Sequence, residues 1–457
     1  MRVKEFLFGL HCAAIGFYSE NSLSQAMKSC ESPTIVFSGL NRTDETWLKD
    51  YLSPDLANIL PEAELAQLIQ RRIMTTDVFT RVDVTSENDD SGCRLKVDVD
   101  EKWTRIPVIR GAYGGGTPLT VLGAYETHAF GKLYSLGGEV RRYGTRPWGA
   151  YLFAKSPRAW RGKGSFGGEL WLDRRRRGFF DAEANVLGYA DSEAWTAKSQ
   201  ILFPFSEASV NNGKIDGDAI GGAWQWGAHI ELVRESRAVF LDREFNDRPD
   251  LKPSGVSIPS QVEGTAQVMP MLVFDRLTVD RMSLDGFKGM IRSGGQISQS
   301  QKNGDDDHQG RNSFSLASET EVFAYSRPVS SVNLALHAFA GNQAKDSLRS
   351  LYFLGGFDSV RGLPDGIHFG RSISYLNLEG RWQFLETKYL HAQAATFLDH
   401  GAAFSSRDEF LSQRETAVGG GIRLSVPQVY RLLVRVDYGV SIGSTKSRGL
   451  SIGLGQF

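Results

Sequence analysis

One arginine and two carboxylates in the C-terminal third of the 457-residue sequence have the types and spacing to form a buried ionic site. Arg361 belongs to the glycine-rich segment Gly355-Gly356-Phe357-Asp358-Ser359-Val360-Arg361-Gly362, and Glu379 and Asp399 follow downstream. An arginine drawn into an enclosed space is costly unless carboxylates receive its donors. Two carboxylates facing one guanidinium supply that pairing, in bidentate geometry where the positions allow it. The chemistry we expect is therefore ion pairing.

Alternating segments carry both carboxylates. In residues 375–384, Asn377, Glu379 and Arg381 share one face, and the apolar side chains Leu376, Leu378, Trp382 and Phe384 share the other. The segment around Asp399 repeats the pattern, with Phe397 and Asp399 opposite Leu398. A period of two is that of a β-strand with one apolar and one polar face. We expect Glu379 and Asp399 on the same polar side of neighbouring strands, with the Arg361 loop folded back onto them.

Three motifs in this order resemble the signature of the outer-membrane assembly and two-partner secretion superfamily, the barrel family of BamA, TamA and FhaC. They are Val360-Arg361-Gly362, Asn377-x-Glu379-x-Arg381 and Phe397-x-Asp399-x-Gly401. The resemblance implies that the loop enters the barrel and that Arg361 meets Glu379 and Asp399, with Asn377, Arg381, Phe397 and Gly401 in support. The family's aromatic residue after the loop glycine is Leu363 here. The cluster either braces the loop or gates the barrel; we favour the brace, whose loss would damage function through folding.

Composition points to a barrel without reference to the family. The mean hydropathy is −0.27, and no run of 18 apolar residues offers a transmembrane helix. The chain has 49 glycines, 11% aromatic residues and many short alternating segments, as in barrels whose lipid-facing and lumen-facing residues alternate. A soluble all-β protein fits composition alone equally well. The formal net charge of −1 argues against a nucleic-acid partner, which requires a basic surface.

The fold that we predict is mainly β, with residues 103–457 forming an antiparallel transmembrane β-barrel. At about 10 residues per strand plus turns, this length fits roughly sixteen strands. Tight connections at 386–388 and 427–428 are expected in the periplasm, and the longer one at 405–415 outside. By this parity the Arg361 loop starts outside and turns inward. The resemblance implies that the first and last strands, 105–113 and 449–456, meet at a weak seam that opens to the bilayer.

The N-terminal residues have the features of a secretory signal peptide, which together with the predicted barrel indicates a location in the bacterial outer membrane. Residues 1–26 combine a start charged by Arg2 and Lys4, a mostly apolar middle and the small-x-small site Ser24-Gln25-Ala26. Cleavage leaves Cys30 and Cys93. In an oxidising periplasm these two cysteines either form a disulfide or remain unpaired thiols.

Residues 32–102 are predicted to form a small α+β domain in the order β-α-α-β-β, located in the periplasm. Thr43 is the expected N-cap of a first helix through Tyr51, and Pro61-Glu62 opens a second helix. The motifs Gly39-x-x-x-Thr43, Phe79-x-x-Val82 and Val97-x-Val99-x-Glu101 resemble a polypeptide-transport-associated (POTRA) domain, present in a single copy. The edge Phe79 to Thr85 is either a site where an extended polypeptide adds by β-augmentation or part of a simple spacer.

Other candidate sites are weaker. Arg174 to Arg177 is expected in an outer hairpin loop, where the arginines either contact lipopolysaccharide phosphates or are merely solvated. Two matches to G-x-S-x-G, at 439–443 and 449–453, lie in alternating segments and not at the strand-to-helix elbow which that motif requires. The histidines lack metal-ligand spacing. We therefore expect no enzyme, no cofactor and no metal site.

These observations together predict an outer-membrane barrel that assists the insertion, assembly or translocation of another molecule through a lateral seam. The small domain would deliver the substrate. The expected partners are outer-membrane lipids, lipopolysaccharide and an unfolded outer-membrane or secreted polypeptide, with no nucleic acid. The alternatives are a two-partner-type polypeptide secretion pore and a lipid-handling or structural barrel, with which a homodimer is compatible.

Overall fold

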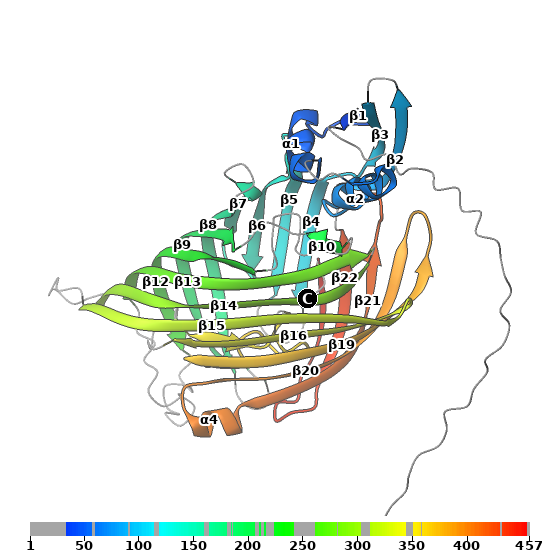
Figure 1. Cartoon of the computed structure of the whole chain (residues 1–457). Helices are drawn as coiled ribbons and strands as arrows, with labels where there is room; N and C mark the ends of the chain where they lie inside the picture. The colour runs from blue at the N-terminus through cyan, green and yellow to red at the C-terminus, as the bar shows by residue number, and fades with distance from the viewer. Residues whose placement is uncertain are drawn as a thin grey trace, which may run out of the picture.

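The computed structural model describes residues 33–56, 60–89, 92–113, 118–159, 164–180, 184, 186–205, 210–211, 214–215, 224–241, 261–280, 282–302, 311–343, 351–357, 359–429 and 432–454. A small α+β region precedes a closed antiparallel barrel of sixteen strands (Figure 1), which confirms the predicted fold class. The predicted signal segment 1–26 and Cys30 lie outside the described residues. Cys93 is disulfide-bonded, and its pairing with Cys30 stays a prediction.

The N-terminal region, residues 33–102, follows the predicted order of elements. These are β1 (Thr34–Ser38), α1 (Glu45–Leu56), α2 (Glu62–Met74), β2 (Phe79–Asp89) and β3 (Gly92–Glu101). Strand β3 is central, parallel to β1 and antiparallel to β2. Alternating residues of β3 and residues of α2 at helical spacing form one apolar core: Leu65, Ile69, Ile73, Leu95, Val97 and Val99. Among the described residues, no helix is long and apolar enough to cross a bilayer.

The start of α1 differs from the prediction by one residue. Asp44, not Thr43, is the capping side chain, because its Oδ1 accepts a hydrogen bond from the backbone N–H of Trp47 at 2.8 Å. This hydrogen bond is the main cause of the lowered pKa of Asp44. A carboxylate here also faces the positive end of the helix dipole. The helix continues past Tyr51 to Leu56.

The barrel strands pair antiparallel in chain order, and the last closes onto the first. They are β4 (Arg105–Tyr113), β5 (Leu119–Ala129), β6 (Tyr134–Tyr143), β7 (Gly149–Ala159), β8 (Gly164–Phe180), β9 (Val186–Pro204), β12 (Trp224–Leu241), β13 (Gln261–Asp280), β14 (Ser283–Lys302), β15 (Arg311–Val329), β16 (Val332–Gln343), β19 (Ser372–Glu386), β20 (His391–Phe404), β21 (Arg414–Ser425), β22 (Leu433–Ser441) and β23 (Arg448–Leu454). Short elements outside the barrel sheet are β10 (Val210–Asn211) with β11 (Lys214–Ile215), β17 (Tyr352–Leu354) with β18 (His368–Gly370), and α4 (Arg407–Ser412).

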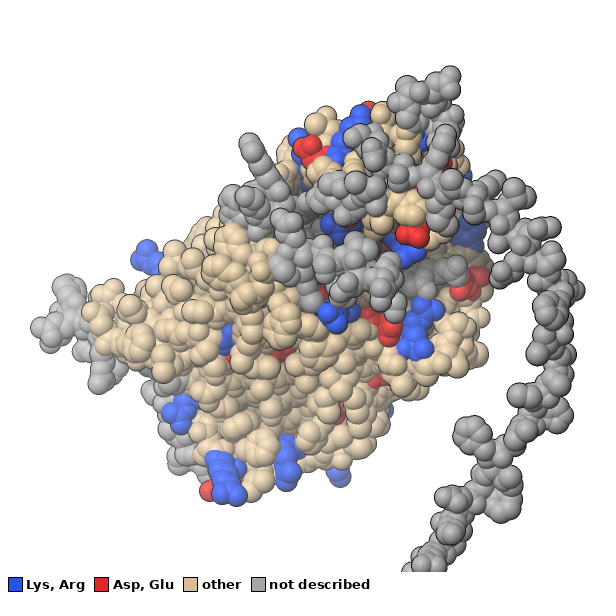
Figure 2. Space-filling model, viewed as in Figure 1, with Lys and Arg blue, Asp and Glu red and all other residues tan. Residues whose placement is uncertain are grey.

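The barrel wall is apolar outside and polar inside. On β19, Leu378 and Trp382 are exposed on the outer face, whereas Asn377, Glu379 and Arg381 are buried on the inner face. Figure 2 shows the result as a broad belt with few charged side chains across the barrel wall. This arrangement inverts that of a water-soluble protein and is the one that a surrounding bilayer selects. The alternation of residues 375–384 therefore predicted both faces correctly.

One end of the barrel holds the N-terminal region; we call it the near end and the opposite end the far end. The β5–β6 turn makes the contact. Its Leu133 is 5% exposed and belongs to the apolar core of the N-terminal region. The backbone N–H of Asp44 donates to Gly131 O at 3.2 Å, and Thr43 Oγ1 lies 3.0 Å from His128 Nε2. A barrel turn thus completes the core of the N-terminal region.

Six neighbouring barrel strands, β8, β9, β12, β13, β14 and β15, are longer than a bilayer requires. They have 17 to 20 residues each, whereas about 9–11 suffice to cross. The excess extends the hairpins beyond the rest of the barrel (Figure 1). The prediction that Arg174 to Arg177 lie in a hairpin loop is therefore wrong, because these residues belong to the extended part of β8.

Candidate functional site

The loop between β16 and β19 enters the barrel from the far end. Its β17–β18 hairpin leads to an apolar cluster at the loop base: Leu354, Val360, Leu363, Ile367, Ile373, Ala403 and Ala417. Leu363, at the position where the family motif has an aromatic residue, is 1% exposed. Its side chain anchors the loop by apolar packing. Residues 351–371 are called the lumen loop below.

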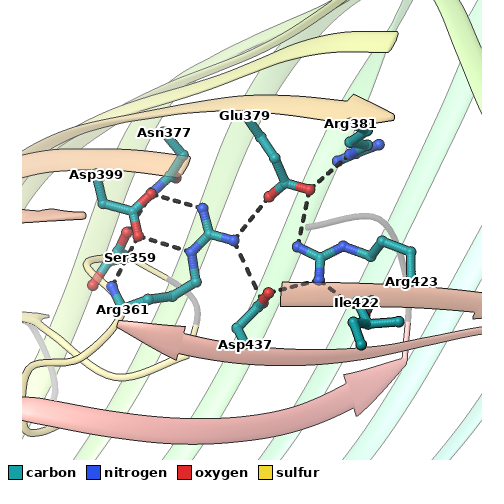
Figure 3. Close-up of polar contacts among 9 residues, drawn as sticks. All are labelled: Ser359, Arg361, Asn377, Glu379, Arg381, Asp399, Ile422, Arg423 and Asp437. Carbon is teal, nitrogen blue, oxygen red and sulfur yellow. Dashed lines mark hydrogen bonds and ion pairs between the residues drawn. The ribbon is translucent and has the colours of Figure 1, made fainter. Parts of the chain in front are cut away.

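Arg361 is the centre of the ionic cluster in the lumen (Figure 3). Its Nε and Nη2 donate to the two carboxylate oxygens of Asp399, both at 2.8 Å, and its Nη1 donates to Glu379 Oε2 at 2.8 Å. The backbone N–H of Arg361 also donates to Asp399 Oδ2 at 3.0 Å. All three side chains are buried. The structure thus brings together the three residues that the sequence motifs pointed to, with bidentate geometry at Asp399.

A second layer of charges completes the cluster, and sequence reasoning missed two of its members. Asp437 lies 3.4 Å from Arg361 Nη1, and Arg423 bridges Asp437 Oδ1 at 2.6 Å and Glu379 Oε1 at 2.9 Å. Arg381 Nε donates to Glu379 Oε1 at 2.7 Å. Three arginines therefore meet three carboxylates, so that the buried cluster is neutral and each charge is paired, as burial requires.

The residues predicted to support the loop lie around it. Asn377 Nδ2 donates to the backbone carbonyl of Ser359 at 2.5 Å, and the Arg361 guanidinium lies 3.6 Å above the ring of Phe397, within cation–π range. A Cβ at Gly401 would lie 2.7 Å from Tyr375 Cβ. Each of these residues therefore fixes the loop or permits the close packing beneath it.

The lumen loop also contacts the last two strands of the barrel. Gly362 has φ +89°, and a Cβ there would lie 2.5 Å from the carbonyl carbon of Gly439 on β22, so only glycine fits. The Phe357 ring lies 3.4 Å from Arg435 Cζ and so close to Gly453 on β23 that a Cβ there would be 2.2 Å away. Phe357, which sequence reasoning did not select, thus joins the loop to the closing strand.

Of the junctions between neighbouring strands in the described part of the barrel, the closing pair β23–β4 has the fewest registered residue pairs. Three residue pairs join it, Leu450–Tyr113, Ser451–Ala112 and Ile452–Gly111. The flanking junctions β4–β5 and β22–β23 have eight and seven. Within the described residues, 105–110 of β4 have no register partner on β23, and Ile109 is 70% exposed. Among the described residues, the near half of β4 therefore has register partners only on β5.

The candidate peptide edge Phe79 to Thr85 lies in β2, at one side of the three-stranded sheet of the N-terminal region. Gln70 Nε2 donates to the carbonyl of Val82 at 2.7 Å, so one acceptor on this edge is occupied from α2. Capture of a polypeptide here stays a prediction.

Within the part of the chain that the structure describes, no group of three or more His, Cys, Asp or Glu side chains is placed to hold a metal ion. The second G-x-S-x-G match lies wholly in β23 and the first begins in β22, so neither sits on an elbow between a strand and a helix. Neither match has the geometry of a nucleophile site.

A closed antiparallel barrel with an apolar outer wall, a polar lumen and an inward loop defines the class of transmembrane β-barrel proteins. No protein-family model matches the sequence, and no curated protein matches it. The fold is similar to that of BamA from Haemophilus ducreyi lacking POTRA domains 1-3, with a TM-score of 0.53 and 14% identity over 93% of this chain and 84% of that one. CdiB from Acinetobacter baumannii gives a TM-score of 0.54 and 13% identity over 93% and 74%. The chain therefore has the fold of the BamA and CdiB barrels.

Proposed function

We propose that this chain is an outer-membrane barrel that helps to insert or assemble other outer-membrane polypeptides through the β4–β23 seam. The observation that carries the proposal is the short register of this junction among the described residues, where Arg105 to Arg110 of β4 pair only with β5. A strand edge offers backbone donors and acceptors to an incoming extended polypeptide. Because three pairs hold the junction, fewer hydrogen bonds oppose its opening than oppose the opening of the flanking junctions. No covalent chemistry is required.

The N-terminal region supports the proposal by its position. Residues 32–102 would act in the periplasm as a single POTRA-type domain. They meet the barrel at the near end, where β4 begins. The ion pair Arg42–Glu126 and the hydrogen bond from Trp103 N to Gln428 O at 2.7 Å hold this region against the barrel. A polypeptide guided along the region would therefore reach the seam without crossing the lumen.

A disulfide across the seam tests the proposal. Gly111→Cys and Ile452→Cys place two cysteines at a registered pair, in a background with Cys12, Cys30 and Cys93 replaced by serine. In oxidising medium we expect the locked protein to lose activity, measured as slower growth and lower levels of outer-membrane proteins in the producing bacterium. Reduction should restore both readouts.

The matched control keeps Ile452→Cys and moves its partner to Val436, the registered neighbour on β22. This disulfide joins two strands that are already fully paired, so we expect no loss of activity. Normal growth and normal outer-membrane protein levels in the seam-locked strain, with the crosslink complete on gels, would show that lateral opening is not the mechanism.

A polypeptide secretion pore of the two-partner type is the second candidate, favoured by the structural similarity to CdiB. This route runs through the lumen and requires the lumen loop to leave it. A seam-locked protein that still works would select this candidate. A lipid-handling barrel would instead lose outer-membrane lipid asymmetry, with outer-membrane protein levels unchanged, when the seam is locked.

A further inference from the structure

Five arginines gather on the outward-facing side of the barrel at its far end. They come from β6, the β6–β7 connection, β8 and β12: Arg142, Arg146, Arg174, Arg176 and Arg234. Contacts connect most of them into one patch. Arg142 Nε donates to the carbonyl of Arg146 at 3.1 Å, and Arg146 and Arg176 share Asp191. We call this set the arginine patch.

The arginine patch carries an excess of positive charge. Arg174 pairs with Glu193 at 3.0 Å. Among the described residues, Asp191 and Glu193 of β9 are the only acids on the outward face of β6, β8, β9 and β12. Five guanidinium groups therefore face two carboxylates, in contrast to the neutral cluster in the lumen. Exposed arginines in excess suit phosphate, which their planar fork binds in bidentate geometry.

A hollow in the outer wall lies directly on the near-end side of the arginine patch. Its volume is about 770 Å³. Its floor consists of small residues, and a Cβ added at Gly264 would meet nothing within 4 Å. Larger apolar side chains surround this floor. The small residues are Ala150, Ala197, Gly264 and Ala266, and the larger ones include Leu152, Leu170, Trp195, Leu232 and Ile297.

Strand register fixes how the hollow and the patch lie relative to each other. Trp195, Arg234 and Gly264 share one row across β9, β12 and β13, so Arg234 lies at the rim of the hollow. Arg174 lies two residues further out than Leu172, or roughly 7 Å. The hollow spans the six strands β7, β8, β9, β12, β13 and β14, about 24 Å at the usual strand spacing. This width accommodates several acyl chains side by side, with phosphate groups above them.

We propose that the hollow and the arginine patch bind lipid A, the phosphorylated and multiply acylated part of lipopolysaccharide. The proposal rests on the outer-membrane placement proposed above, which puts the far end in the outer leaflet, but not on the seam or on any polypeptide substrate. The phosphates of lipid A match the positive charge of the arginine patch, and its several acyl chains match the width of the hollow. Lipid A also lies in the outer leaflet, where the far end is placed. A glycerophospholipid offers two chains to a hollow wide enough for more.

Titration of the purified full-length protein in detergent with deep-rough lipopolysaccharide, followed by native mass spectrometry, tests the site. Phosphatidylglycerol is the comparison lipid. We expect at least tenfold tighter binding of the lipopolysaccharide. The double variant R174Q/R234Q should weaken it about tenfold or more, and Ala266→Phe, which fills the hollow without adding charge, by several-fold. R234Q alone, at an exposed position, serves if the double variant does not fold.

Arg276→Gln is the matched control, because Arg276 is an exposed arginine at the near end of β13, far from the hollow. We expect it to bind lipopolysaccharide as the unaltered protein does. Equal affinity for both lipids, or unchanged lipopolysaccharide binding in folded R234Q, would overturn the proposal. The binding measurement is made in detergent and does not depend on opening of the seam. A failure to bind lipopolysaccharide therefore says nothing about the seam, and a seam-locked protein that still works says nothing about lipid binding.

Discussion

Replacing Arg361 by alanine would remove the central cation of the lumen cluster and leave one carboxylate with almost nothing to balance it. Asp399 is fully buried and receives both Nε and Nη2 of Arg361. In the variant, the contact that persists from residue 361 is its backbone N–H. Glu379 keeps Arg381 and Arg423. The cost is therefore concentrated on Asp399.

The magnitude follows from the burial. Removing one partner of a buried ion pair costs about 3–5 kcal/mol, because the remaining charge is uncompensated. Loss of the cation–π contact with Phe397 adds about 0.5–2 kcal/mol. We expect a decrease of about 4 kcal/mol in the free energy of unfolding. Adding Asp399→Asn removes the orphaned charge, so R361A/D399N should be more stable than the sum of the single effects predicts, by at least about 1 kcal/mol.

Urea unfolding of the barrel in lipid vesicles, followed by tryptophan fluorescence, measures these differences. Arg371→Ala is the matched control on the same loop, since Arg371 is half-buried and donates to the carbonyl of Ser405; its loss should cost about 1 kcal/mol. An R361A variant no less stable than R371A, or strict additivity with D399N, would refute the view that the cluster braces the loop.

Two further predictions concern packing. Gly362→Ala should lower the free energy of unfolding by at least about 2 kcal/mol in the same assay, because it combines a left-handed backbone with a clash at Gly439. Gly264→Ala is the control: its added Cβ meets nothing within 4 Å, so we expect a change within about 0.5 kcal/mol. Leu133→Ala should destabilise the N-terminal region by about 2–5 kcal/mol, seen as faster hydrogen exchange in α2 while the barrel stays intact. Leu390→Ala, in an exposed near-end turn, should leave the exchange in α2 unchanged. Equal exchange in both variants would contradict this prediction.

The sequence predicted which face is polar in residues 375–384 and around Asp399, because a period of two leaves no ambiguity about sides. It could not predict which polar residues of non-adjacent strands meet. Asp437 and Arg423 were visible as polar members of alternating segments, but the contacts of Arg423 with Glu379 and of Asp437 with Arg361 depend on the tilt and stagger of β19 to β22 around the barrel. Alternation placed Glu379 and Asp399 on one polar side near the Arg361 loop, and the resemblance added that this loop enters the barrel to meet them.

Local preferences explain the remaining differences. Thr43 and Asp44 are both good N-cap residues. In the structure Asp44 caps the helix, and Thr43 contacts His128 on the barrel. Arg174 to Arg177 suggested a solvated loop by composition. In the structure Arg175 and Arg177 point inward, the latter 3.6 Å over the ring of Phe353 in the lumen loop. A run of four arginines does not indicate whether a strand ends at the membrane surface or continues beyond it.

The position of Leu133 has a consequence for the order in which the chain folds. Because the core of the N-terminal region is completed by a side chain from the β5–β6 turn, this region reaches full stability only when the β5–β6 hairpin has formed. The region and the hairpin are therefore one cooperative unit, and we expect the barrel to grow from its N-terminal strands. The β23–β4 junction, which joins residues more than 330 positions apart, then closes last, since it has the largest loop-closure entropy and, among the described residues, the fewest registered pairs to offset it.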